Sequence, residues 1–254
     1  MYHSQISIVD GMKERSAKEE KAYSHPGHFH EYVFGQTLAK FHWEIFDLLL
    51  EGKNEPLGDF NPIVILAPRN HAKTTNFAES YPLWMGGVDP NSLMCQIVSS
   101  TSVVAATRLG RIKSCIQHNT RYKDLFGDLF PGRDGRWSND AIELKRDHTL
   151  SWAVGNEERD PSVAAYGITT SVEGGRTTLQ IFDEIVTFEN SKTPAGRQTV
   201  SNKFFTTFSP MLLPFGQQIV LGTRYAFNDF YAEAIAKFDT EKLYTDMYPE
   251  GYDE

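Results

Sequence analysis

The chain has 254 residues, of which 40% are hydrophobic and 23% are charged, so it can bury a full core and its composition excludes disorder as the default. Its 25 basic and 33 acidic residues give a formal net charge of −8, which argues against a protein that coats nucleic acid with its whole surface. Any grip on DNA must come from a local basic face or from several subunits, because each phosphate contact needs its own cation.

Membrane proteins and disulfide-rich proteins are also disfavoured. No apolar run approaches the roughly 18 residues that a membrane span needs, and the charged first 25 residues lack the apolar region of a secretory signal. We therefore expect a soluble, intracellular protein with no membrane partner. Cys95 and Cys115 are too few for a disulfide scaffold or a cysteine zinc site, and both are predicted to be reduced packing residues.

The N-terminal region is predicted to be an arm that is followed by a helix. The first 24 residues are polar and charged with little periodicity, which is typical of an arm or a short solvated helix. Between Leu38 and Leu50, apolar residues follow helical spacing until Gly52 ends the run. We therefore divide the chain into an arm over 1–37 and one domain over 38–254.

Short apolar runs predict strands that are buried on both faces. They lie at 63–66, 94–98, 179–182 and 218–221, with an alternating pattern around 141–154. A helix is predicted over 102–117, with Val103, Ala106, Leu109, Ile112 and Ile116 on its apolar face. Buried strands separated by helices favour an α/β fold with a mainly parallel central sheet flanked by helices.

The run at 63–66 leads directly into a candidate phosphate-binding loop. Against the pattern G-x-x-x-x-G-K-[ST], Lys73 and Thr74 are in register as the phosphate-binding cation and the magnesium-binding hydroxyl. Ala67 and Ala72 stand where glycines are expected. Because alanine adopts a positive φ less readily than glycine, we expect a loop conformation that tolerates a Cβ at both positions. The predicted ATP-binding segment is Pro68, Arg69, Asn70, His71, Ala72, Lys73, Thr74 and Thr75.

Two alternatives stay open for this loop. Lys73 and the two threonines after it would also suit the start of a solvated helix that follows a strand. Arg69 is placed to touch the γ-phosphate within the same chain, although a surface arginine in a turn is an equal interpretation.

Asp183 and Glu184 end the third apolar run, at the carboxyl edge of the sheet where open α/β sheets bind ligands. We assign Asp183 to magnesium and Glu184 to the general base, the two acidic roles in hydrolysis of a nucleoside triphosphate. The run at 94–98 is expected to be the additional strand between the loop and the acidic pair. Taken alone, the pair would more often be a solvated strand end.

The fourth run ends in Gly222-Thr223-Arg224-Tyr225. We expect the hydroxyl of Thr223 to sense the γ-phosphate through water and to pass its loss to a neighbouring segment. A strand end with a satisfied threonine is the alternative.

Together these residues resemble the N-terminal ATPase domain of the large terminase subunit of tailed bacteriophages. The resemblance covers about residues 38–235, in the family's order. In that family the loop is usually of a proline-arginine-glycine-histidine-glycine-lysine-serine type, so Asn70 and Ala72 depart from it. The matching segments are Phe41-His42-Trp43-Glu44, the loop from Ala67 to Thr74, Gly174-Gly175-Arg176, Ile181-Phe182-Asp183-Glu184, Gly222-Thr223-Arg224-Tyr225 and Asn228-Asp229.

The resemblance implies an additional-strand P-loop ATPase that uses ATP and Mg²⁺ to move double-stranded DNA into a viral procapsid, in the cytoplasm of the host cell. It implies the portal protein and the small terminase subunit as partners, a homo-oligomeric ring during packaging and a monomer in solution. Lys73 and Thr74 would bind nucleotide and magnesium, Asp183 and Glu184 would form the acidic motif, and Thr223 would be the coupling residue.

Members of that family often use an arginine near the acidic strand to reach the ATP of a neighbouring subunit. Arg176 is the candidate here, Arg224 and Arg69 compete with it, and a structural role in the glycine turn is an equal alternative. The nuclease domain that usually accompanies this ATPase, with carboxylates for two metal ions, is expected to be absent from residues 1–254.

Two alternative functions would also use these residues. One is a helicase or restriction-type DNA translocase, which needs a second motor domain. Another is a non-hydrolysing, nucleotide-binding assembly protein whose loop has lost its glycines.

Two side-chain clusters have simpler explanations. The histidines at 25, 28 and 30 are interpreted as a surface turn, because a metal site would need further ligands at suitable spacing. A basic stretch suits contact with DNA phosphates or a solvated helix face equally well. Its members are Arg108, Arg111, Lys113, Arg121 and Lys123.

Overall fold

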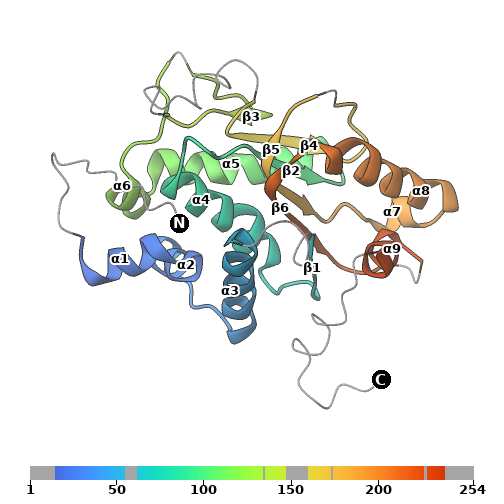
Figure 1. The fold of residues 1–254 in the computed structure, drawn as a ribbon, viewed down its shortest axis with the longest axis horizontal. Helices are drawn as coiled ribbons and strands as arrows, with labels where there is room; N and C mark the ends of the chain where they lie inside the picture. The colour runs from blue at the N-terminus through green and yellow to red at the C-terminus, as the bar shows by residue number, and fades with distance from the viewer. Residues whose placement is uncertain are drawn as a thin grey trace.

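The computed structural model describes residues 15–54, 62–133, 135–146, 160–172, 174–225 and 228–237. These residues form an α/β structure whose sheet has the strand order β1-β6-β5-β2-β4-β3. The first five strands in this order pair in parallel, and β3 pairs antiparallel with β4. The prediction of a mainly parallel sheet flanked by helices is confirmed (Figure 1). The strands are β1 Ile63–Leu66, β2 Cys95–Ser99, β3 Ala141–Ile142, β4 Val163–Gly167, β5 Thr177–Asp183 and β6 Leu212–Gly222.

The strand order corrects one expectation. The strand between β1 and β5 is β6, whereas β2 lies on the far side of β5. The run at 94–98 is therefore not the inserted strand. Sequence order could not show this, because β6 comes last along the chain and reaches its central place by a crossover.

Two strands differ in extent from their sequence signals. β6 begins at Leu212, well before the predicted run at 218, because its first half is more exposed and contains Pro214 and Gly216. β4 was not predicted, since Val163-Ala164-Ala165-Tyr166-Gly167 is short and rich in small residues. Of the alternating pattern around 141–154, residues 141–142 form β3, and residues 147–154 lie outside the described part of the chain.

Alternate residues of each central strand pack on opposite faces of the sheet. Ile97, Ile181 and Ile219 belong to one hydrophobic cluster, whereas their neighbours Phe182 and Val220 belong to another. Both faces of the sheet are therefore covered by hydrophobic side chains, which is why these strands have uninterrupted apolar sequences.

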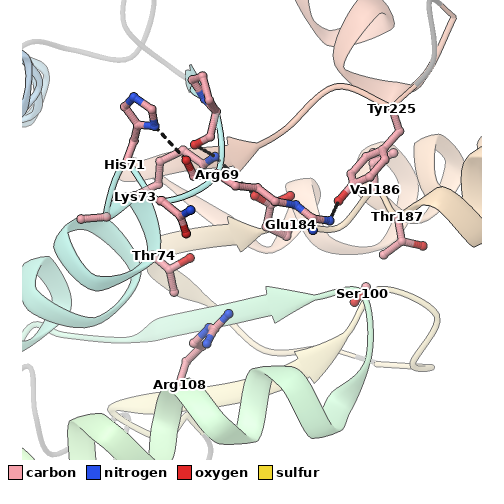
Figure 2. Close-up of a pocket in the computed structure, with 13 residues that line it drawn as sticks. Arg69, His71, Lys73, Thr74, Ser100, Arg108, Glu184, Val186, Thr187 and Tyr225 are labelled. Carbon is pink, nitrogen blue, oxygen red and sulfur yellow. Dashed lines mark hydrogen bonds and ion pairs between the residues drawn. The ribbon is translucent and has the colours of Figure 1, made fainter.

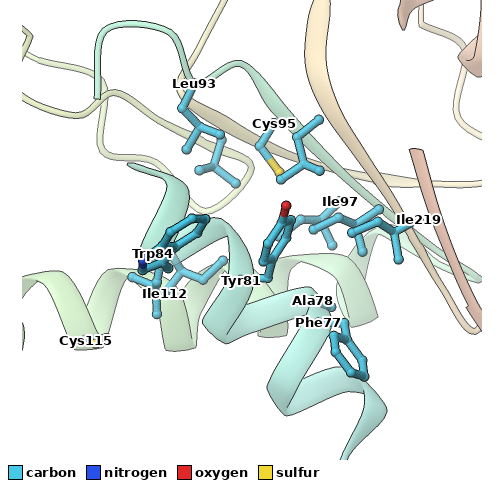
Figure 3. Close-up of a cluster of buried hydrophobic side chains, with 14 of the residues drawn as sticks. Phe77, Ala78, Tyr81, Trp84, Leu93, Cys95, Ile97, Ile112, Cys115 and Ile219 are labelled. Carbon is cyan, nitrogen blue, oxygen red and sulfur yellow. The ribbon is translucent and has the colours of Figure 1, made fainter. Parts of the chain in front are cut away.

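The first cluster is covered by N-terminal helices together with η1 and the helices after it. The side chain of Tyr81 points toward Cys95 and Ile97, and Phe77 and Trp84 of the same cluster lie on either side of it (Figure 3). The thiols of both cysteines are free and buried, as predicted. The elements on this side are α1 Ala17–Ser24, α2 Pro26–Phe34, α3 Lys40–Asn54, the π-helix η1 Thr74–Ser80, α4 Tyr81–Val88, α5 Ser102–His118 and α6 Thr120–Phe126.

The described part of the segment 1–37 is helical and contributes to this same core. α1 begins at a capping box formed by Ser16 and Glu19. Ala22, Phe29 and Val33 are buried in the first cluster. The two N-terminal helices therefore pack onto the body of the protein.

The apolar face of α5 differs from the predicted one. Ala105, Leu109, Ile112 and Ile116 are buried, whereas Val103 is 77% exposed. At 3.6 residues per turn, Val103 lies about 200° around the helix from Ala105, so it faces solvent. The other predicted positions of that face are partly or fully buried.

The second cluster is covered by C-terminal helices, which gather on the right of the sheet in Figure 1. They are α7 Phe188–Ser191, α8 Pro194–Asn202, the π-helix η2 Lys203–Phe208, the 3-10 helix η3 Ser209–Met211 and α9 Phe230–Lys237. Across the described residues, no helix combines the length and the apolar character needed to cross a membrane.

Buried glutamines align β2, β5 and β6 on this side. Gln96 pairs in register with Gln180, and Gln180 with Gln218. The amide of Gln218 donates to Gln180 Oε1 over 2.7 Å, and the amide of Gln180 donates to the carbonyl of Phe208 over 2.6 Å. A slip in strand register would leave these buried amides without partners, so they help to specify the pairing.

Burial of His30 makes stability depend on pH. Desolvation lowers the pKa of His30 from 6.5 to about 4, so between these values the unfolded chain binds a proton that the folded chain does not. We expect the free energy of unfolding to fall by about 2 kcal/mol between about pH 7 and pH 5 through this residue. Urea unfolding of His30→Gln should show a correspondingly weaker pH dependence. An identical pH dependence in wild type and variant, with exposed His118→Gln as the control, would contradict this.

Candidate active site

A pocket of about 430 Å³ lies at the carboxyl edge of the sheet, beyond the ends of β1, β5 and β6 (Figure 2). Parallel strands bring these three ends together, although they are far apart in sequence. The residues that line the pocket are Pro68, Arg69, Asn70, His71, Ala72, Lys73, Thr74, Ser100, Arg108, Glu184, Val186, Thr187 and Tyr225.

The loop between β1 and η1 uses left-handed backbone conformations at two non-glycine residues. Asn70 has a φ of 66° and Ala72 a φ of 51°. Ala67 does not adopt a positive φ. The expectation of a loop that suits a Cβ is therefore wrong at Ala72, where tertiary contacts hold an alanine in a conformation that glycine would adopt without strain.

Histidines brace this loop from two sides. The ring of His71 bonds through Nδ1 to the carbonyl of Arg69 at 2.9 Å. His42 of α3 accepts the N–H of Ala39 at Nδ1, so its Nε2–H donates to the carbonyl of His71 over 3.0 Å. Burial lowers the pKa of His42, which favours this neutral form. The FHWE segment therefore supports the loop through His42.

Lys73 is folded back into the site, where it is only 5% exposed. Its ammonium donates to the carbonyls of Ala67 and Pro68 and, over 3.1 Å, to Thr223 Oγ1. It also lies 3.4 Å from Glu184 Oε1. A buried ammonium needs such partners, because leaving water without them is costly. Lys73 is thus tied to the ends of β5 and β6.

Thr74 and Asp183 meet at the base of the pocket. Thr74 Oγ1 donates to Asp183 Oδ1 over 2.8 Å, and Asp183 is fully buried at the end of β5. The other oxygen of Asp183 accepts a bond of 2.9 Å from Nε of Arg108, which projects from α5. A hydroxyl and a carboxylate oxygen in contact are hard ligands of the kind that Mg²⁺ binds.

Glu184 follows Asp183 in a left-handed conformation, with a φ of 51°. Its Oε1 accepts the hydroxyl of Thr223 over 3.0 Å, while its buried Oε2 has no hydrogen-bond partner among the described residues. An unpartnered carboxylate oxygen in a polar pocket is suited to accept a proton or to bind a water molecule.

Thr223 joins the two halves of the site, since its hydroxyl accepts from Lys73 and donates to Glu184. Gly222 precedes it, and a Cβ at that position would collide with the ring of Tyr231. Close packing of α9 on β6 therefore requires this glycine and positions Thr223 at the strand end.

The predicted arginines lie in different places. Arg69 lines the pocket and donates to the hydroxyl of Tyr225 over 2.6 Å, and Arg224 is exposed. Arg176 stands just before β5, at the opposite edge of the sheet, in a separate cavity of about 820 Å³, with its Nε 3.7 Å from Asp160 Oδ2. It cannot reach the pocket of its own chain, and its action on a neighbouring subunit stays a prediction. Thr75 lies in the first turn of η1 and does not line the pocket.

Some site residues were missed by sequence analysis. Arg108 was placed in a basic stretch for DNA contact or a solvated face, and Ser100, Thr187 and Tyr225 received no role. The signal available for Arg108 was its place in the second turn of a helix that follows a buried strand, which puts it near the carboxyl edge of the sheet.

Metal binding by protein ligands alone finds no support in the described residues, where no three His, Cys, Asp or Glu side chains gather at one point. The prediction that the three N-terminal histidines lie in a surface turn is wrong, because His28 and His30 lie in α2 and His30 is buried. His25 caps α2 and bonds to Asp47, and His28 packs on Trp43. The Thr74–Asp183 pair would hold a magnesium ion only together with substrate oxygens, which is the usual mode for Mg²⁺.

Comparison with models of known protein families gave no match, and no curated protein matches the chain. The interpretation of the site therefore rests on its own geometry.

The strained alanine can be tested directly. We expect Ala72→Gly to raise the free energy of unfolding by about 1 kcal/mol, because glycine has no steric penalty at positive φ. Ala67→Gly, where φ is not positive, should lower it by about 0.5–1 kcal/mol. Denaturant unfolding without nucleotide measures both. Equal destabilisation by the two substitutions would show that Ala72 does not hold this conformation.

Proposed function

We propose that this protein is a P-loop ATPase and acts as the DNA-packaging motor domain of a viral large terminase. One observation carries the ATPase proposal. Lys73, Thr74, Asp183, Glu184 and Thr223 come from three separate segments and are joined by hydrogen bonds and an ion pair at one edge of the sheet. A cation, two hydroxyls and two carboxylates in this arrangement suit hydrolysis of a metal-bound nucleoside triphosphate.

Each group has a defined role in the proposed reaction. The loop and Lys73 would bind the β- and γ-phosphates. Thr74 and Asp183 would hold Mg²⁺, which would neutralise charge on the phosphates. Glu184 orients a water molecule and takes its proton as the water oxygen bonds to the γ-phosphorus. The bond from that phosphorus to the bridging oxygen breaks, and ADP leaves with the electron pair.

The contact between Lys73 and Glu184 fits a resting site. A triphosphate carries more negative charge than one carboxylate, so it would draw the ammonium of Lys73 away from Glu184. Glu184 would then be free to act as a base. Because Thr223 touches both side chains, the end of β6 would respond to the same change.

The motor assignment rests on the order of the strands and of the motifs. The strand order, with β6 between β1 and β5, suits an additional-strand P-loop ATPase, and the motif order resembles that of large terminases. The proposed partners are double-stranded DNA, the portal protein and the small terminase subunit, with a ring of subunits during packaging. Because the formal net charge of the chain is −8, each subunit would make few contacts with DNA phosphates, and several subunits would bind the DNA together.

Steady-state phosphate release tests the ATPase proposal. Lys73→Ala and Glu184→Gln should each lower kcat/KM for Mg-ATP by at least about 100-fold, since one removes a phosphate cation and the other the base. The matched controls are Lys192→Ala and Glu189→Gln, which alter an exposed lysine-glutamate pair in α7 and its C-terminal cap. Equal rates in wild type and both site variants would leave only a non-hydrolysing assembly protein.

Dependence on DNA separates the motor from other translocases. We expect linear double-stranded DNA to raise the ATPase rate severalfold, with a loss of this stimulation as salt is raised. Single-stranded DNA at equal nucleotide concentration is the control. Stimulation by single strands alone would favour the helicase.

A binding assay tests the proposed partners. We expect the immobilised protein to retain the portal protein and the small terminase subunit, and failure to retain them would count against packaging.

A further inference from the structure

Arg108 forms an ion pair with Asp183, the residue predicted to bind magnesium. It lies in α5, its side chain is 19% exposed, and its Nε donates to Asp183 Oδ2 over 2.9 Å. Figure 2 shows the side chain rising from α5 toward the space between Thr74 and Ser100, across the pocket from Arg69 and Tyr225. Arg108 therefore faces the same space as Lys73 but from the opposite wall.

The two oxygens of Asp183 are divided between a hydroxyl and a guanidinium. Oδ1 binds Thr74, and Oδ2 binds Arg108. A guanidinium has five N–H donors in a planar fork, so Nε can hold a carboxylate while the Nη groups bind another anion. Within the described part of the chain, Nε is the one nitrogen of Arg108 that makes a hydrogen bond. Its remaining donors are available on the pocket side.

Charge balance points to the anion that they would meet. Once a divalent ion binds at Asp183, that single carboxylate faces both the metal and Arg108. The excess positive charge would need an anion close by, and the phosphates of a bound nucleotide would supply it. The γ-phosphate supplies this charge in a triphosphate and is missing in a diphosphate.

We propose that Arg108 bridges Asp183 and the γ-phosphate. Through this contact Arg108 would make the site of its own chain prefer nucleoside triphosphates to diphosphates. This inference rests on the proposed nucleotide site. Arg108 would then determine nucleotide specificity in addition to neutralising the buried Asp183. Substitution by lysine distinguishes these two roles, because lysine can neutralise Asp183 but, as a point charge, lacks the planar fork that binds two anions at once.

Arg111 provides a matched control on the same helix. It lies three residues further along, its side chain is 56% exposed, and it pairs with Glu79 at 2.9 Å. It does not line the pocket. Substitution of Arg111 changes the charge of α5 in the same way without touching Asp183.

The experiment is titration calorimetry with Mg²⁺ and either ADP or the β,γ-imido analogue of ATP, on wild type, Arg108→Lys, Arg108→Gln, Arg111→Lys and Arg111→Gln. We expect Arg108→Lys to weaken binding of the triphosphate analogue by at least tenfold and binding of ADP by less than threefold. Arg108→Gln should show the same loss of preference, and both Arg111 variants should bind as wild type does.

The outcomes distinguish this inference from the proposed function. Wild-type preference in Arg108→Lys, or equal weakening of both nucleotides in that variant, overturns the bridging role while leaving the nucleotide site in place. A wild type that binds neither nucleotide overturns the proposed function, and the inference falls with it. The thermal unfolding temperature of Arg108→Lys serves as the folding control. We expect it to be close to that of the wild type, because lysine keeps a cation beside Asp183.

Discussion

Parallel pairing of β1, β6 and β5 is the constraint on which the candidate site depends. The three strands point in one direction, so their carboxyl ends meet at a single edge and bring Lys73, Glu184 and Thr223 into contact. Parallel strands need crossover connections and coverage on both faces, which the two layers of helices provide. The buried glutamines then oppose a slip of register that would separate the groups.

Burial fixes the positions of the polar side chains at this edge. Lys73 and Asp183 are almost inaccessible to solvent, and both have charged or hydrogen-bonding partners. In such surroundings an unpaired charge is costly, so each side chain is held in one arrangement and movement of one favours movement of its partners. This coupling is the physical basis on which we propose that nucleotide binding at Lys73 reaches Glu184 and the end of β6.

Strain is concentrated in the same place. Asn70, Ala72 and Glu184 are the non-glycine residues with positive φ in the described part of the chain, and all of them line the pocket. Left-handed backbone is unfavourable for such residues and persists only where the surroundings hold it. Here the bracing by His42, the buried Lys73 and the strand pairing at Glu184 provide those surroundings.

By itself the sequence determined what depends on neighbours along the chain. The apolar runs located β1, β2, β5 and the buried half of β6, and the loop and the acidic pair were found at the ends of their strands. Tertiary structure decided which strand separates β1 from β5, that Arg108 faces Asp183, that Arg176 stands at the opposite edge, and that Ala72 is left-handed. These features follow from contacts between segments that are distant in sequence, and hydrophobic periodicity carries information only about the local chain.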